Sequence, residues 1–326
     1  MTDEAEAVVR LEEVLLGGPR RYTRLEVSER TGVPTEVGQR LWRALGFPDV
    51  GDEEEYFTDG DIEALRLLRQ LEDVGIVDTE LAITNARAMA RQLAQLADWQ
   101  VGIFVERFLR AAGSEPDDVL DLIPVVMEQI VPAVQQLVVY VWRRQLASAG
   151  GRLLVSVGSE LTDATLAVGF ADLVGYTRLV RGLDETELDR LIDSFESRAS
   201  DLVATTGGRV VKTIGDEVMF VAPDVRTAIE IGVGLSETLH AGDGPDVRVG
   251  IAWGSVLSRL GDIYGSTVNL ASRLTTIAKP GSVLLDLAAV EALGDEPSYR
   301  VKPIPRVRVR GFGAIEPYVV RRRVDV

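Results

Sequence analysis

The pattern of apolar residues changes near residue 150, and this change limits the fold more than any other feature of the sequence. Before it, apolar residues recur three and four positions apart, as from Asp61 to Leu71, which is the period of an amphipathic helix. After it, short β-branched runs such as Thr165 to Phe170 and Arg209 to Ile214 are bounded by glycine and aspartate and predict strands. The 326 residues leave room for two domains, and the change of pattern predicts that they belong to different fold classes.

The first domain, residues 1–147, is predicted to be all-helical, and residues 148–163 to form a linker. Gly32-Val33-Pro34 separates two short helices, and Thr58-Asp59-Gly60-Asp61 offers caps for the next one. The small residues Ser148-Ala149-Gly150-Gly151 mark the start of the linker.

The second domain, residues 164–326, is predicted to follow the order strand, helix, hairpin, helix, strand. Helical periodicity covers Glu185 to Thr205 and Val225 to Leu239, and Val247 to Gly254 resumes as a strand. This order predicts an α+β fold of the ferredoxin-like type, with helices on one face of a mainly antiparallel sheet.

Composition excludes several kinds of site. The chain has no cysteine and one histidine, His240, so thiolate zinc sites, iron–sulfur clusters and multi-histidine metal sites are excluded. Its acidic start, Met1-Thr2-Asp3-Glu4, is unlike a secretory leader, and a cytoplasmic location is expected. The most apolar stretch, Ile123 to Trp142, contains Glu128 and Pro132 and is predicted to be a buried helix rather than a membrane span.

The charge is unevenly distributed along the chain. The formal net charge is −16, of which residues 1–150 contribute −12, from 27 acidic and 15 basic side chains. Because a negative surface repels a phosphate backbone, nucleic acid is not an expected partner. Any phosphate chemistry is assigned to the second half, whose net charge is only −4.

Two pairs of polar residues in the second domain are candidates for chemistry. Asp172 ends an apolar strand and Asp216 occupies a tight turn between strands, so the two can converge on divalent cations, which prefer oxygen ligands and bridge to phosphates. Asn269 and Arg273 are four apart on a predicted helix and can face one ligand. Taken singly, each aspartate also fits a turn residue bonded to its own backbone, and the helix pair also fits a solvated face.

Three ordered motifs change this assessment: Phe170 to Thr177, Lys212 to Met219, and Gly261 to Arg273. Together they resemble the class III nucleotide cyclases and, within them, the adenylate cyclases. The resemblance covers residues 160–322. It implies an enzyme that converts ATP to 3′,5′-cyclic AMP and pyrophosphate, with two divalent cations, Mg²⁺ or Mn²⁺, in each site.

The resemblance also implies roles for the residues around the reacting atoms. Asp172 and Asp216 would hold the cations, with the backbone carbonyl of Leu173 as a further ligand. Asn269 would position the ribose, and Arg273 would stabilise charge on the phosphate under attack.

The resemblance also implies which residues bind the nucleotide. Lys212 and Asp262 would read adenine, because an ammonium suits a ring nitrogen acceptor and a carboxylate suits the exocyclic amine, whereas guanine mismatches both. Arg310, where relatives carry a lysine, would bind the terminal phosphates. The loop after the first strand would bind the substrate through Gly175, Tyr176 and Thr177.

The family assembles its sites from two chains, metal ligands coming from one and the purine and transition-state residues from the other. Because this chain carries both sets, the resemblance implies a homodimer with two equivalent sites at the interface, in which a lone chain is inactive.

The first domain leaves alternatives open. Arg21 to Pro34 resembles a helix-turn-helix, similar to the start of winged-helix transcription regulators, so the alternative function is a DNA-binding or nucleotide-sensing regulator without turnover. The charge of residues 1–150 opposes DNA binding, and no metal ligand or transition-state residue is missing.

In some actinobacterial cyclases a similar helical domain precedes the catalytic one and regulates it in response to pH or lipid. Val119 to Trp142 then forms either a core or dimer helix or the lining of a fatty-acid or lipid pocket. The sequence does not reveal the signal, or whether the domain inhibits or activates.

Overall fold

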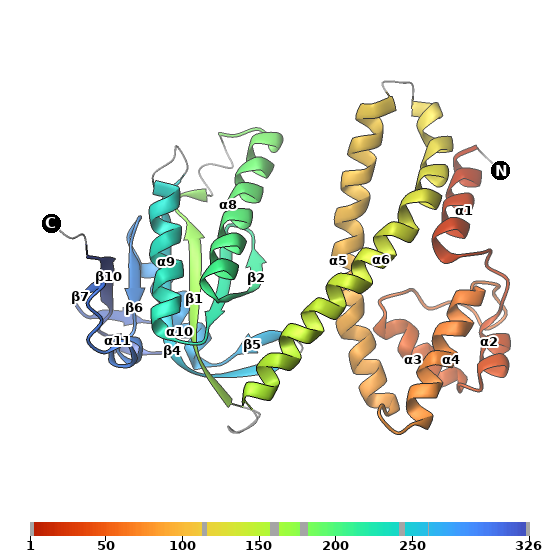
Figure 1. Cartoon of the computed structure of the whole chain (residues 1–326). Coiled ribbons are helices and arrows are strands. Elements are labelled where there is room, and N and C mark those ends of the chain that lie inside the picture. The colour runs from red at the N-terminus through yellow and green to blue at the C-terminus, as the bar shows by residue number, and fades with distance from the viewer. Residues whose placement is uncertain are drawn as a thin grey trace. The chain divides into compact units, whose positions relative to one another are not determined.

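The computed structural model describes residues 3–112, 116–156, 163–176, 182–240, 245–259 and 261–323. The chain divides into two units, Met1–Gly151 and Arg152–Val326 (Figure 1). Within the described ranges, no helix combines the length and apolar character needed to cross a membrane.

The first unit is helical, as predicted. Its helices are α1 (Asp3–Leu16), α2 (Arg24–Thr31), α3 (Thr35–Ala44), α4 (Asp59–Asp73), α5 (Thr79–Ala112) and α6 (Pro116–Ser156). Gly32, in the left-handed conformation with φ of 68°, ends α2 before the turn into α3. The expected cap of α4 is present, because the Thr58 backbone N–H donates to the Asp61 carboxylate at 2.8 Å.

Helix α6 does not stop where the sequence predicts a linker. It continues through Ser148-Ala149-Gly150-Gly151 to Ser156. Each glycine costs a helix only about 1 kcal/mol relative to alanine, and helix-forming residues flank the pair on both sides. Residues 157–162 of the predicted linker lie outside the described residues.

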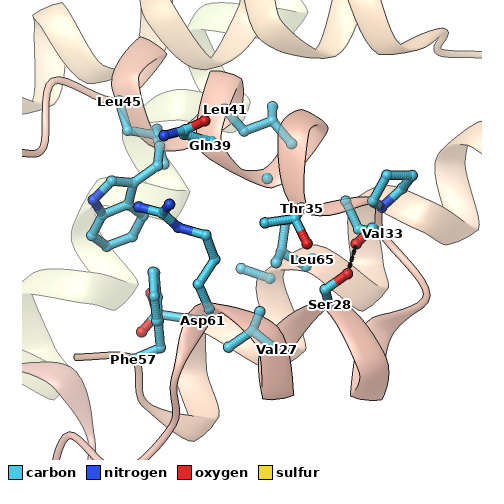
Figure 2. Close-up of a pocket in the computed structure, with 15 residues that line it drawn as sticks. Val27, Ser28, Val33, Thr35, Gln39, Leu41, Leu45, Phe57, Asp61 and Leu65 are labelled. Carbon is cyan, nitrogen blue, oxygen red and sulfur yellow. Dashed lines mark hydrogen bonds between the residues drawn. The ribbon is translucent and has the colours of Figure 1, made fainter. Parts of the chain in front are cut away.

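A cavity of about 90 Å³ lies between α2, α3 and α4, lined mainly by apolar side chains that include Val27, Leu41, Phe57 and Leu65 (Figure 2). None of the predicted site residues lines it.

The predicted lipid pocket along residues 119–142 gains no support from the structure. On this stretch of α6, Leu137, Tyr140 and Trp142 are exposed to solvent, and the side chains of residues 119–126 lie outside the described part.

Two of the three basic residues of the helix-turn-helix, Arg21 and Arg24, form ion pairs within the chain, and so does Arg43 of the following helix. The Asp49 carboxylate accepts hydrogen bonds from Arg43 at 2.6 Å, from Arg24 at 2.8 Å and from Gln39 at 3.0 Å. The hydrogen bonds from Arg43 and Gln39 lower the pKa of Asp49 to about 2. These cations are therefore neutralised by the chain itself, which weakens the DNA-binding alternative.

The second unit is an α+β fold whose first elements follow the predicted order. Its elements are β1 (Asp163–Leu173), α8 (Glu185–Thr206), β2 (Arg209–Ile214), β3 (Glu217–Ala222), α9 (Val225–His240), β4 (Val247–Arg259), β5 (Asp262–Tyr264), α10 (Ser266–Ile277), β6 (Val283–Leu285), α11 (Leu287–Leu293), β7 (Tyr299–Pro303), β8 (Val307–Val309), β9 (Gly313–Ile315) and β10 (Tyr318–Arg322). The main sheet has the order β2-β3-β1-β4-β6-β10-β7, with β5 paired to β4. Its described pairings are antiparallel except for β4 with β6.

Helices cover both faces of this sheet, so the prediction of helices on one face is wrong. Ala167 and Ala171 of β1 belong to the core beneath α8 and α9 (Figure 1), whereas Val168 and Phe170 belong to the core beneath α10. Because both sides of this central strand are apolar, each side needs a covering layer.

Gly250 of β4 allows α10 to approach the sheet closely. A β-carbon at this position would lie 2.3 Å from the backbone nitrogen of Thr275 and 2.5 Å from the carbonyl oxygen of Ala271. Only glycine fits such an approach without moving the helix. The depth of α10 on the sheet, and therefore the position of every side chain that it carries, depends on this residue.

Candidate active site

Two aspartates meet where β1 ends. Asp172 lies opposite Glu217 of β3 and Arg248 of β4 in the strand register. Asp216 occupies the turn between β2 and β3, and its backbone carbonyl accepts a hydrogen bond from the Leu173 N–H at 3.1 Å. The Asp172 carboxylate lies near enough to Asp216 for its charge to raise the pKa of Asp216.

The electrostatics of this cluster favour a cation. Burial, followed by the nearby Asp172 carboxylate, raises the pKa of Asp216. Burial and the charges of Asp172 and Asp216 raise the pKa of Glu217 to about 7. Such shifts arise where carboxylates crowd without enough positive charge, and a divalent cation with oxygen ligands would relieve them.

The residues present fit divalent cations that are shared with a phosphate-bearing ligand. Within the described ranges, no group of three or more acidic or histidine side chains could form a complete metal site. Asp172 and Asp216 alone would leave coordination positions open, and phosphate oxygens are suitable ligands for them.

Arg248 is a member of this site that the sequence reasoning missed. Its Nε donates to Asp172 Oδ2 at 2.5 Å, and its Nη1 donates to the carbonyl oxygen of Thr276 in the last turn of α10 at 3.3 Å. The signal in the sequence was a single charge between Val247 and Val249, whose side chains are buried on the opposite face of β4.

Lys212 and Asp262, 50 positions apart, form an ion pair. The Lys212 Nζ lies 2.6 Å from Asp262 Oδ2, while Asp262 Oδ1 accepts from the Ile263 N–H at 2.8 Å. Burial alone would raise the pKa of Asp262, but the hydrogen bonds from Lys212 and Ile263 lower it overall. A β-bulge between Val210 and Lys212 shifts the register of β2 directly before the lysine.

Asn269 and Arg273 lie on the exposed side of α10, whose buried side carries Ala271 and Leu274. Their spacing places them on one face, as expected for residues four apart. Arg273 forms no ion pair with any residue in the described ranges.

Of the remaining predicted residues, Gly175 and Arg310 lie in turns. Gly175 takes a φ of 77° directly after β1, a conformation that favours glycine, and Tyr176 packs partly buried against the core. Thr177 lies outside the described residues. Arg310 is exposed in the turn between β8 and β9, which form a separate two-stranded sheet.

Comparisons with known proteins identify relatives of both units. Residues 160–322 match the family of the adenylate and guanylate cyclase catalytic domain, and residues 3–149 match the adenylate cyclase regulatory domain. An adenylate cyclase of Streptomyces coelicolor is 41% identical, over 98% of this chain and 91% of its own length. An adenylate cyclase of Streptomyces griseus is 40% identical, over 99% of this chain and 90% of its own.

Among solved structures, the adenylyl cyclase CyaB from P. aeruginosa is similar over 50% of this chain and 95% of its own, with 23% identity and a TM-score of 0.45. The family matches and the near full-length relatives establish the relationship. The chain belongs to the class III nucleotide cyclases, as an adenylate cyclase whose catalytic domain follows the regulatory domain of that family.

Proposed function

We propose that this adenylate cyclase converts ATP to 3′,5′-cyclic AMP and pyrophosphate at two sites shared between the chains of a homodimer, each site using two divalent cations, Mg²⁺ or Mn²⁺. The observation that carries the proposal is the meeting of Asp172 and Asp216 at the end of β1, where the Leu173 N–H, next to Asp172, donates to the Asp216 backbone carbonyl at 3.1 Å.

Asp172 and Asp216 would hold the cations through their carboxylates, with the Leu173 carbonyl as a further oxygen ligand. When bound, the cations would lower the pKa of the ribose 3′-hydroxyl and stabilise charge on the phosphates. The aspartates thereby fix where the nucleotide's phosphates lie relative to the sheet. Gly175, Tyr176 and Thr177 follow the same strand and would approach the phosphates from the loop.

Lys212 and Asp262 would select adenine. In the chain without nucleotide they satisfy each other at 2.6 Å. With ATP in place, the ammonium would donate to a ring nitrogen and the carboxylate would accept from the exocyclic amine. Guanine offers a carbonyl and a ring N–H at these positions, so it would leave polar groups unpaired.

Asn269 and Arg273 would act on the ribose and on the phosphate under attack. Asn269 would hold the ribose so that its 3′-hydroxyl points at the α-phosphorus, and Arg273 would donate to the oxygens that gain charge there. Arg310, exposed between β8 and β9, would bind the terminal phosphates, and its planar guanidinium suits two phosphate oxygens at once.

Apolar side chains that are exposed on the single chain support the proposed dimer. Ile214, Leu257 and Tyr264 expose 53%, 47% and 48% of their surface. Ile214 is two positions from Lys212 on β2, and Leu257 pairs with Tyr264, which is two positions from Asp262. Exposed apolar residues beside polar groups are typical of a protein interface. A second chain would bury them and bring its own α10 to the site.

We further propose that the first unit regulates this reaction. Its match to an adenylate cyclase regulatory domain supports the proposal, and pH is retained as a candidate signal. Helix α6 provides the physical route, because it runs unbroken to Ser156, close before β1 begins at Asp163.

The experiment combines an activity assay with subunit mixing. Purified protein is incubated with ATP or GTP and with Mg²⁺ or Mn²⁺, and the cyclic nucleotide is measured. Asp172→Ala and Arg273→Ala should each lose at least a hundredfold in kcat. Mixed together, they should regain activity, because a heterodimer contains one site with neither lesion. If labelled subunits exchange and no activity returns, the shared site is wrong.

A further inference from the structure

The guanidinium of Arg248 occupies the position of a counter-charge in the carboxylate cluster. It binds Asp172 at 2.5 Å, and its charge also acts on Asp216 and Glu217. The Asp172 side chain is 13% exposed and the Arg248 side chain 34%, so water screens this pair only in part. The guanidinium thus contacts Asp172 directly, and its charge opposes the rise in the pKa of Asp216 and Glu217.

Arg248 also joins two elements of the site. Through Asp172 it holds β1, and through the carbonyl oxygen of Thr276 it holds the last turn of α10. That carbonyl is at the negative end of the helix dipole, so it is a favourable partner for a cation. The same helix carries Arg273 one turn earlier.

We propose that Arg248 is a positioning residue that competes with the divalent cation for Asp172. In the cation-free chain it pairs with the carboxylate and ties it to the end of α10. A bound cation would need Oδ2 or Oδ1 of Asp172 as a ligand, and it would place two positive charges beside the guanidinium. The hydrogen bond from Arg248 to Asp172 must then weaken or break. The cost of this exchange weakens cation binding until nucleotide phosphates add their negative charge. This inference rests on the proposed role of Asp172 and Asp216.

The inference predicts a gain of cation affinity when Arg248 is removed. Mn²⁺ binding to the full chain, without nucleotide, is measured by electron paramagnetic resonance of free Mn²⁺. Arg248→Gln should bind Mn²⁺ at least tenfold more tightly than the wild type. Arg306→Gln is the matched control, since Arg306 pairs with Glu316 at 3.5 Å on the surface and should leave the affinity unchanged.

Two further variants separate this inference from the proposed function. Asp172→Asn and Asp216→Asn should lose Mn²⁺ binding. If they do, and Arg248→Gln binds as weakly as the wild type or more weakly, the competition is refuted while the cation site stands. If the aspartate variants bind as the wild type does, both the cation site and the competition are wrong.

Folding is checked by thermal unfolding with and without Mn²⁺. If Arg248→Gln does not fold, Arg248→Lys provides the comparison, because lysine keeps the charge but cannot hold Asp172 and Thr276 with one planar fork. Its Mn²⁺ affinity should exceed that of the wild type by a few-fold. An affinity equal to or below the wild-type value overturns the proposal.

Discussion

Gly250→Ala is expected to inactivate the enzyme while leaving it folded. The added β-carbon would lie 2.3 Å from the Thr275 nitrogen, whereas ordinary contacts begin at 3.4 Å, so α10 must retreat by about 1 Å. Asn269 and Arg273 would move with the helix. A misplacement of about 1 Å costs catalysis about a hundredfold. Overpacking of a core costs about 1–3 kcal/mol, or a fall in Tm of about 2–12 °C for a unit of this size.

The control is Gly232→Ala on α9, which packs on the opposite face of the sheet. Its β-carbon would meet side-chain carbons of Val249, Ile251 and Val283 at 3.1–3.3 Å, so a shift of a few tenths of an ångström suffices. Activity should stay within about twofold of the wild type. Steady-state kinetics measure kcat, and circular dichroism during heating measures Tm. A folded Gly250→Ala protein with wild-type kcat, or an equal loss in Gly232→Ala, would refute the reasoning.

Three further outcomes are expected. Lys212→Met combined with Asp262→Asn should lower the ratio of kcat/KM for ATP over GTP at least tenfold and leave Mn²⁺ binding intact; an unchanged ratio removes the pair from base selection. Asp49, with a folded pKa of about 2 against 3.8 in the unfolded chain, stabilises the fold above about pH 4, and this contribution is lost as the pH falls toward 2. The Tm of Asp49→Asn should therefore be below that of the wild type at pH 6, and the difference should be much smaller at pH 2, where Asp49 is only partly ionised; equal values at pH 6 contradict the assignment. Two residues inserted after Ala149 turn the rest of α6 by about 200° and should change activity several-fold. Seven inserted residues add about two full turns and should leave activity unchanged. Equal effects of the two insertions would mean that the orientation of α6 does not control activity.

The order of elements in the second unit could be predicted because it is a local property. Periods of two and of 3.6 residues are visible within each segment, and β1, α8, β2, β3, α9 and β4 follow them. The coverage of the sheet could not be predicted in the same way. Whether α10 lies on the face of α9 or on the other face depends on how β1 through β4 are ordered, which no single segment records.

For the site as well, residues in local motifs could be predicted from the sequence, and residues that depend on long-range pairing could not. The motifs placed Asp172 and Asp216 at the ends of their strands, where the structure has them. Arg248 was missed because its importance comes from lying opposite Asp172 across 76 positions of sequence. At residues 150 and 151 the local signal was wrong. The two glycines predict the end of a helix, but α6 continues through them because the residues on both sides favour helix.

The two halves of the proposed site differ in how complete they are within one chain. Asp172 is 13% exposed in its side chain and already paired, whereas Arg273 is exposed and forms no ion pair within the described ranges. In the proposed dimer, such a site would bind cations before it could react, because the groups that act on the α-phosphorus would be supplied from the surface of a second chain. Control of how two copies approach would then be enough to control catalysis. In the proposed regulation, helix α6 would carry this control, because it runs unbroken from Pro116 to Ser156 and ends seven residues before β1 begins.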